Sequence, residues 1–235
     1  MLLYLQKIYN MKRTILIICL SAMSFFCYSQ DWFGFERYKA DNERITTSGD
    51  YPEVVFIGNS ITDNWDYYHH GFFQEHNFCG RGIGGQTSAQ MLVRFTADVV
   101  NLRPKAVVIM AGTNDVAHND YCVTPDHVIE NIVAMCKLAR ANGIVPIISS
   151  IPPCSEFPWR KEITDPGQTI VEINNHLKAY AQANGLVYAD YHSALTDEHL
   201  GLPDTLSQDG CHPNPECYTL MENIVLEAIH NALQP

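Results

Sequence analysis

The sequence is short of positive charge: 15 lysines and arginines stand against 26 aspartates and glutamates among 235 residues. The formal net charge of −11 disfavours nucleic acids, anionic membrane surfaces and polyanionic substrates as partners. No uninterrupted apolar run approaches the roughly 20 residues that a membrane-spanning helix requires. We therefore predict a globular protein without stable membrane insertion and exclude a polytopic membrane protein.

The spacings that hold common cofactors are also missing. No two cysteines are separated by two residues, and no group of cysteines and histidines has the spacing of a zinc site. The glycine-rich segment 82–87 does not match G-x-G-x-x-G, and no Lys-Ser/Thr follows it, which disfavours a nucleotide-binding loop. We therefore predict no metal and no other cofactor.

The first 29 residues have the order of parts of a secretory signal peptide. Basic residues 12–13 precede an apolar stretch over 15–26, and the small residue Ser29 follows. We predict cleavage after Ser29, export to the periplasm or the exterior, and a single domain over 30–235. The alternative is a buried first helix.

Six of the eight cysteines follow the predicted cleavage point, and an exported protein can keep disulfides. The sequence does not specify their pairing. We expect Cys136 to be a small buried residue on the apolar face of a helix, and we select Cys211 and Cys217 as the best candidate bridge.

Short apolar runs alternate with segments of helical period after residue 51, as in an α/β protein. Runs without polar interruption are typical of parallel strands buried on both faces. They predict a three-layer α/β/α sandwich around a mainly parallel sheet of about five strands, at 54–57, 106–110, 145–148, 186–188 and, more weakly, 77–79.

Start and stop signals mark four of the intervening helices. Thr87 and Gln90 have capping-box spacing, and Thr124-Pro125 combines a cap with a first-turn proline. A third helix is expected over 170–184. Asn214-Pro215 opens a fourth that runs towards the carboxyl terminus.

Ser60 follows the first strong strand, at the edge of the sheet where α/β proteins bind their ligands. A serine on such a turn can expose its hydroxyl as a nucleophile and offer its N–H to an oxyanion. The alternative is that Ser60 only caps the next helix.

Two further segments could supply hydrogen-bond donors to the same edge. In the segment 82–87, the glycines allow a backbone N–H to approach a ligand closely. The segment leads into the N-terminus of a predicted helix, which favours negative charge. Asn114 follows the strongest predicted strand and can offer its amide, although an Asx turn explains it equally well. The neighbouring Asp115 is either a support for catalysis or a turn residue.

Asp209 and His212 lie three positions apart before the last predicted helix. A carboxylate at this spacing can orient the imidazole, which then accepts the serine proton and returns it to a leaving group. The sequence thus contains a candidate nucleophile, base and orienting acid.

The order Gly-Asn-Ser-Ile, Gly-Ile-Gly-Gly, Gly-Thr-Asn-Asp and Asp-Gly-Cys-His resembles the four blocks of the GDSL esterase/lipase family in the SGNH hydrolase superfamily. The resemblance implies a flavodoxin-like fold and a serine esterase. It implies that Ser60 is the nucleophile, His212 the base and Asp209 its orienter. The oxyanion hole would comprise Ser60, Gly85 and Asn114. The family's usual aspartate before the serine is replaced here by Asn59.

The predicted mature chain leaves little length for a hydrophobic lid, which disfavours long-chain lipids. Aromatic residues near the blocks suit stacking on sugar rings, although gap filling between loops and helices explains them equally well; the candidates for binding substrate are Trp65, Tyr67 and Trp159. We therefore predict a secreted acetyl esterase acting on a small-molecule or carbohydrate ester. The alternatives are a lysophospholipase-like or thioesterase-like short-chain acyl hydrolase, similar to platelet-activating-factor acetylhydrolases, and a non-catalytic carbohydrate-binding protein.

Overall fold

The computed structural model of the protein describes residue 6 and residues 31–120 and 122–234. The predicted signal peptide lies outside the described residues apart from Gln6. Within the described residues, no helix combines the length and the apolar character needed to cross a membrane.

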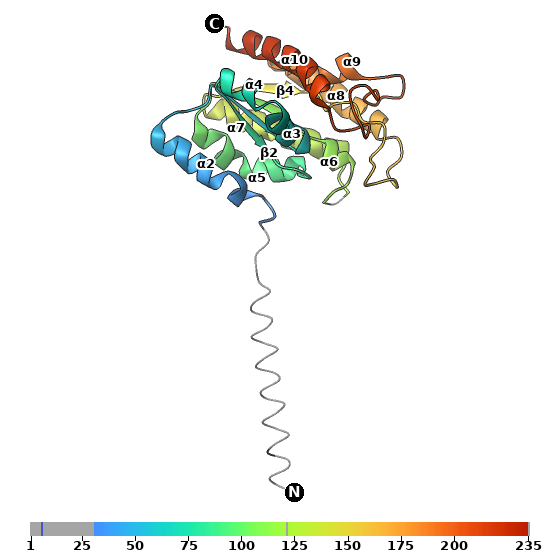
Figure 1. The fold of residues 1–235 in the computed structure, drawn as a ribbon, viewed down its shortest axis with the longest axis horizontal. Helices are drawn as coiled ribbons and strands as arrows, with labels where there is room; N and C mark the ends of the chain where they lie inside the picture. Colours follow the sequence, from blue (N-terminus) through green and yellow to red (C-terminus); the bar gives the residue numbers. More distant parts are fainter. Residues whose placement is uncertain (1–5, 7–30, 121, 235) are drawn as a thin grey trace. The chain divides into compact units, whose positions relative to one another are not determined.

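Five parallel strands form the central sheet in the order β2-β1-β3-β4-β5 (Figure 1). This confirms the expected α/β architecture, and the weakest predicted strand, β2, lies at an edge of the sheet, where fewer neighbours are needed. The strands are β1 (Val54–Gly58), β2 (Phe78–Gly82), β3 (Ala106–Met110), β4 (Val145–Ser149) and β5 (Val187–Ala189).

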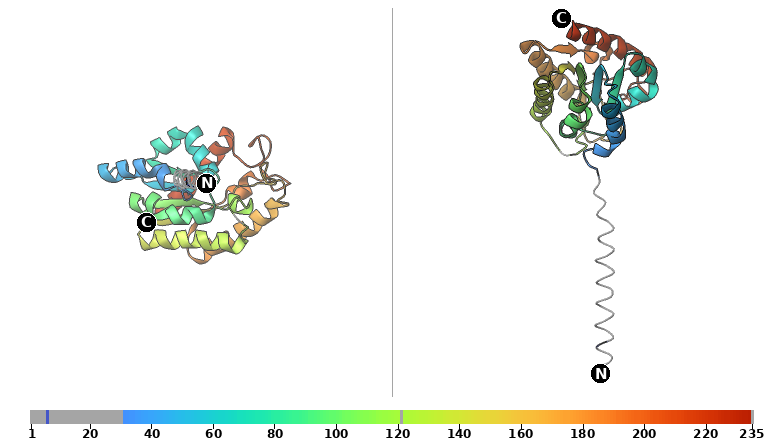
Figure 2. Two further views of the ribbon diagram at one scale, coloured as in Figure 1. Left: turned by 90° about the horizontal axis from the view of Figure 1, so that it is seen from below. Right: turned by 90° about the vertical axis from the view of Figure 1, so that its left-hand side faces the viewer.

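Helices cover both faces of the sheet, so the strands lie between two helical layers (Figure 2). One layer contains α2 (Phe35–Ser48), α5 (Ser88–Asp98), α7 (Pro125–Ala141) and α8 (Pro166–Ala183). The other contains α3 (Ser60–Tyr68), α4 (His70–Glu75), α9 (Tyr191–Leu195) and α10 (Pro215–Leu233). The short elements η1 (Val100–Leu102) and α6 (Thr113–Val116) precede and follow β3.

The two-sided core follows from the alternation of side chains along each strand. In β1, Val55 and Ile57 pack under one helical layer, whereas Val54 and Phe56 pack under the other. All four side chains are at most 2% exposed. Burial on both faces explains why the strand sequences contain no polar interruption.

The capping signals act as predicted at three helices. The Thr87–Gln90 capping box opens α5, Thr124 caps α7, and the Asn214 side chain accepts the Cys217 N–H at 2.9 Å to open α10. The third helix, α8, begins at Pro166, four residues before the predicted start.

The proposed bridge between Cys211 and Cys217 is wrong. Cys211 packs in the core beneath α7 and α8, whereas Cys217 packs in the opposite core beneath α3 and α10. All six cysteines in the described ranges are free thiols. The expectation for Cys136 is confirmed, because it is fully buried on α7.

Candidate active site

Ser60 is the first residue of α3, directly after β1. Its neighbour Asn59 caps the helix, with the Asn59 side chain accepting the Ile61 N–H at 3.0 Å. Asn59 therefore does the capping that was the alternative role for Ser60. The hydroxyl of Ser60 is therefore free to face a different partner. The backbone N–H of Ser60 also has no acceptor within α3, because the first N–H groups of a helix have none.

That partner is His212, whose Nε2 lies 3.0 Å from the Ser60 Oγ. On the other side of the ring, Nδ1 lies 2.7 Å from the Asp209 Oδ2. A carboxylate at Nδ1 fixes the tautomer that leaves Nε2 able to accept a proton from the serine. The structure thus brings the three predicted residues into one chain of hydrogen bonds across 152 sequence positions.

Asp209 is held in its ionised form by its surroundings. Partial burial favours the neutral acid, but hydrogen bonds from the His212 backbone N–H, the His212 ring and the Cys211 N–H outweigh it and lower the pKa of Asp209. Ser207, which no sequence pattern pointed to, adds a further bond: its Oγ donates to the His212 carbonyl at 2.7 Å. These bonds favour the ionised form of Asp209 and fix the position of the His212 ring.

The glycine turn and Asn114 meet beside Ser60. A Cβ on Gly84 would lie 4.0 Å from the Ser60 Cβ, and Gly85 has a φ of +79°, in the left-handed region that glycine tolerates. The Asn114 Nδ2 donates to the Gln86 carbonyl at 3.0 Å, which joins the asparagine to the turn. The glycine turn therefore lies next to Ser60, and Asn114 is joined to the same turn.

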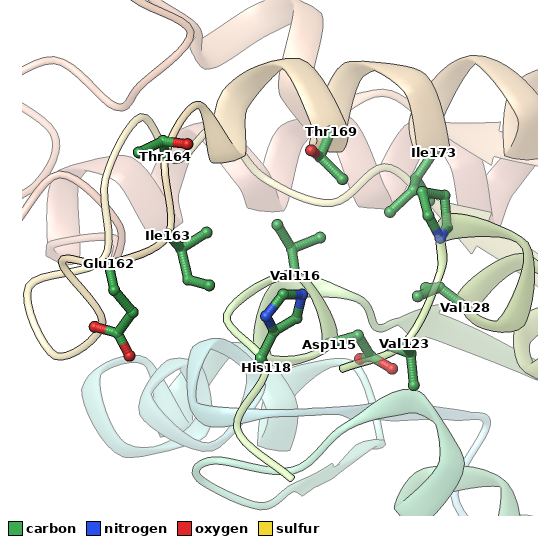
Figure 3. A pocket seen from close by; sticks show the side chains of 11 residues that line it. Asp115, Val116, His118, Val123, Val128, Glu162, Ile163, Thr164, Thr169 and Ile173 are labelled. Atoms are coloured by element: carbon green, nitrogen blue, oxygen red, sulfur yellow. The ribbon is translucent and has the colours of Figure 1, made fainter. Parts of the chain in front are cut away.

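Asp115 is a buried structural residue. Its carboxylate accepts the Ser88 N–H at 2.9 Å and the Ser88 Oγ–H at 2.6 Å, which anchors the start of α5. Burial raises the pKa of Asp115, and the hydrogen bonds from Ser88 only partly oppose it. The carboxylate lies at one side of a cavity of about 290 Å³, into which Val116 and Ile163 project (Figure 3).

The three aromatic candidates differ sharply in exposure. Trp65 is 0% exposed and donates its Nε1–H to Glu222, so the prediction that it contacts substrate is wrong. It lies four residues after Ile61 on the face of α3 that packs on the sheet. Tyr67 is 80% exposed, and Trp159 is 39% exposed with its ring centroid 5.5 Å from that of His212.

A second cavity, of about 210 Å³, borders the catalytic loop on the α3 side. Its lining includes His212 and Asp209 together with Asn64 and the half-exposed ring of Tyr68. In the described part of the chain, no cluster of three or more histidine, cysteine, aspartate or glutamate side chains is arranged to hold a metal ion. The described site therefore offers amide, phenol and imidazole groups to a ligand.

Comparison with known proteins places this arrangement in a family. The model of the GDSL-like Lipase/Acylhydrolase family matches residues 56–220. The crystal structure of a GDSL-like lipase from Bacteroides thetaiotaomicron VPI-5482 is 41% identical, covers 86% of this chain and 100% of that one, and gives a TM-score of 0.83. A solved structure from Bacteroides fragilis NCTC 9343 is 42% identical, with a coverage of 88% and 100% and a TM-score of 0.84.

Matches to curated sequences are shorter. The uncharacterized lipoprotein YqeF of Bacillus subtilis strain 168 is 33% identical over 123 residues, which are 45% of this chain and 51% of that protein. Subunit alpha2 of platelet-activating factor acetylhydrolase IB from Rattus norvegicus is 24% identical over 129 residues, 53% and 56% of the two chains. The chain thus matches about half the length of these curated relatives. From the family match and the solved neighbours, the chain belongs to the GDSL-like lipase/acylhydrolase family of the SGNH hydrolase superfamily.

Proposed function

We propose that the protein is a serine esterase in which Ser60 is the nucleophile, His212 the general base and Asp209 the residue that orients it. The observation that carries the proposal is the chain of hydrogen bonds from Ser60 through His212 to Asp209. An esterase needs this order of groups, because a serine hydroxyl becomes an effective nucleophile only when an adjacent base takes its proton.

The reaction then proceeds in two halves. The Ser60 Oγ attacks the ester carbonyl carbon while the His212 Nε2 takes the proton of the Ser60 hydroxyl. The resulting oxyanion accepts hydrogen bonds from the backbone N–H groups of Ser60 and Gly85 and from the side-chain amide of Asn114. Collapse of this intermediate breaks the bond to the alcohol, which leaves with the proton from His212. Water then attacks the acyl-enzyme in the same way, which releases the carboxylic acid and regenerates Ser60.

The proposed substrate is a short acyl ester, acetyl in the first place, carried on a carbohydrate. The exposed rings of Tyr68 and Trp159 both lie near His212, where an alcohol leaving group must take its proton: Tyr68 lines the same cavity, and the Trp159 ring centroid is 5.5 Å from that of His212. Aromatic faces at a polar, open site suit sugar rings. A second candidate, a short-chain acyl hydrolase of lipid-like substrates, is favoured by the similarity to platelet-activating factor acetylhydrolase.

The proposed location is outside the cytoplasm, with residues 1–29 as a removable signal peptide and 30–235 as a single catalytic domain. The order of charge, apolar stretch and small residue supports this. Expression of the full chain followed by amino-terminal sequencing of the exported protein should give Gln30 as its first residue. Recovery of the uncleaved chain in the cytoplasm would contradict the proposal.

Hydrolysis of p-nitrophenyl esters from acetyl to dodecanoyl tests the activity. We expect a preference for acetyl that Ser60→Ala abolishes and that Ser193→Ala, at an exposed serine of α9, leaves unchanged. A maximum at longer acyl chains would favour the lipid-like substrate. The absence of turnover at every chain length would favour a binding protein.

A further inference from the structure

The Asn119 side chain lies between the two segments that bring donors to Ser60. Its Nδ2 donates to the Asn114 Oδ1 at 2.8 Å and to the Gly85 carbonyl at 3.2 Å. Its Oδ1 accepts the indole N–H of Trp159 at 3.1 Å. One side-chain amide thus connects the glycine turn, the asparagine after β3 and the loop after β4.

The chemistry of these partners fixes which way each amide points. An indole nitrogen only donates, so the Asn119 oxygen must face Trp159 and the Asn119 nitrogen must face away. A backbone carbonyl only accepts, which demands the same orientation at Gly85. The Asn119 nitrogen therefore meets the Asn114 oxygen, and the Asn114 nitrogen is the atom left to donate.

That outcome matters because the two ends of an amide have nearly the same shape and opposite polarity. One hydrogen of the Asn114 Nδ2 is taken by the Gln86 carbonyl at 3.0 Å, and the other is available for an oxyanion. If the Asn114 amide turned over, its oxygen would face the developing negative charge and repel it.

Trp159 is itself held at both ends. Its ring packs against His212, with the centroids 5.5 Å apart, and the next residue, Arg160, donates to the His118 carbonyl at 2.9 Å. Phe157, on the other side of Trp159, is 1% exposed. The loop after β4 is therefore tied to the segment that carries Asn119, and the indole contacts the base as well as the amide.

We propose that Asn119, oriented by Trp159, is a positioning residue that keeps the Asn114 carboxamide turned with its nitrogen towards the oxyanion. The inference rests on the proposed role of Asn114. It assigns to Asn119 and Trp159 an effect on the transition state and none on proton transfer by His212.

The test is a double-mutant cycle in the purified full chain, with p-nitrophenyl acetate as substrate and thermal melting as the check on folding. Asn119→Leu has nearly the same size and cannot donate. We expect it to lower kcat by about 10- to 100-fold with little change in KM and in the pH midpoint of kcat. The matched control is Asn184→Leu, which removes a side-chain bond of similar length to the Tyr180 carbonyl at 2.8 Å on α8; we expect it to leave kcat unchanged.

The cycle separates positioning from a general structural role. Asn114→Ala alone should lower kcat by about 100- to 1,000-fold. Adding Asn119→Leu to Asn114→Ala should not lower kcat further, because Asn119 acts only through the Asn114 side chain. Trp159→Phe keeps the ring against His212 and removes the N–H. It should therefore also lower kcat, and it carries the test if Asn119→Leu does not fold.

A wild-type kcat for Asn119→Leu, or losses that multiply in the double variant, would overturn the positioning role. A wild-type kcat for Asn114→Ala would instead overturn the proposed oxyanion hole. The two failures are therefore distinguishable, since the first leaves the effect of Asn114→Ala intact.

Discussion

Replacement of Arg94 by methionine should destabilise the protein more than the loss of any surface ion pair. Arg94 on α5 is 0% exposed, and its guanidinium donates to the Asp98 carboxylate at 2.8 Å and the Gln86 side chain at 2.6 Å. It also donates to the carbonyls of Gly58 and Arg81, at 3.0 and 2.9 Å. Asp98 is the last residue of α5, and the other acceptors lie at or near the ends of β1 and β2 and in the glycine turn, residues 82–87.

The size of the effect follows from what Arg94→Met leaves behind. Asp98 becomes a buried carboxylate without its cation, a change that costs about 3 to 5 kcal/mol in comparable cases. For a chain of this length, each kcal/mol lowers the melting temperature by about 2 to 4 °C, so the expected fall is about 6 to 20 °C. Thermal and urea unfolding followed by circular dichroism measure it.

Two further variants separate the buried charge from the loss of bulk. Arg37→Met breaks an exposed pair with Asp63 and should cost about 0 to 1 kcal/mol. Adding Asp98→Asn to Arg94→Met should recover part of the loss, because the unpaired charge disappears. A loss below about 1 kcal/mol for Arg94→Met, or no recovery with Asp98→Asn, would refute the reasoning, since the uncompensated carboxylate supplies the cost.

Three other predictions concern pH, thiol reactivity and backbone packing. Burial lowers the pKa of His192, so the imidazole is protonated more readily in the unfolded chain, and the folded state loses stability as the pH falls below about 6.5. His192→Gln should therefore show a smaller fall in melting temperature from pH 7 to pH 5 than the wild type. An equal fall in the two proteins would contradict this. Cys122 is exposed, whereas burial raises the pKa of Cys136 to about 12. In a thiol-titration assay, Cys122→Ser should therefore remove one rapidly reacting thiol, and Cys136→Ser should remove none. Loss of a rapidly reacting thiol in Cys136→Ser would argue against the burial of Cys136. A Cβ on Gly82 would lie 2.1 Å from the Asp63 backbone N, so Gly82→Ala should lower the free energy of unfolding by about 1 to 3 kcal/mol. Gly71→Ala, with open space around the new Cβ, should have little effect. Equal melting temperatures for the two variants would show that the turn at Gly82 can relax.

The parts of the fold that sequence reasoning reached are those where one physical requirement dominates. Strands buried on both faces need uninterrupted apolar residues, and the first turns of α5, α7 and α10 need side-chain caps. The candidate site was accessible for a related reason, because parallel strands bring their carboxyl ends to one edge. Separate short motifs after β1, β2 and β3 could therefore be expected to meet.

The parts that were missed lack such a signal. Helix α2 buries only Ile45 among its 14 residues, and its sequence is mostly polar, so it lacks the apolar content that marked the other helices. Trp65 was misread because its burial depends on α3 packing against the sheet, although the four-residue spacing from Ile61 was a usable sign. The bond between Asn119 and Trp159 joins residues 40 positions apart, and no local pattern links them.

The distance in sequence between Ser60 and His212 sets the order in which the protein acquires its properties during synthesis. The two side chains meet across 152 positions, and the histidine immediately precedes α10, the last helix. A ribosome therefore completes all five strands before it adds His212, the base in the proposed mechanism, so the chain is expected to be chemically inert until then. Contacts between residues so far apart in the sequence also form slowly compared with local helices. Enzymatic activity therefore reports that the last-made segment has docked, and its rate of appearance measures the final step of folding.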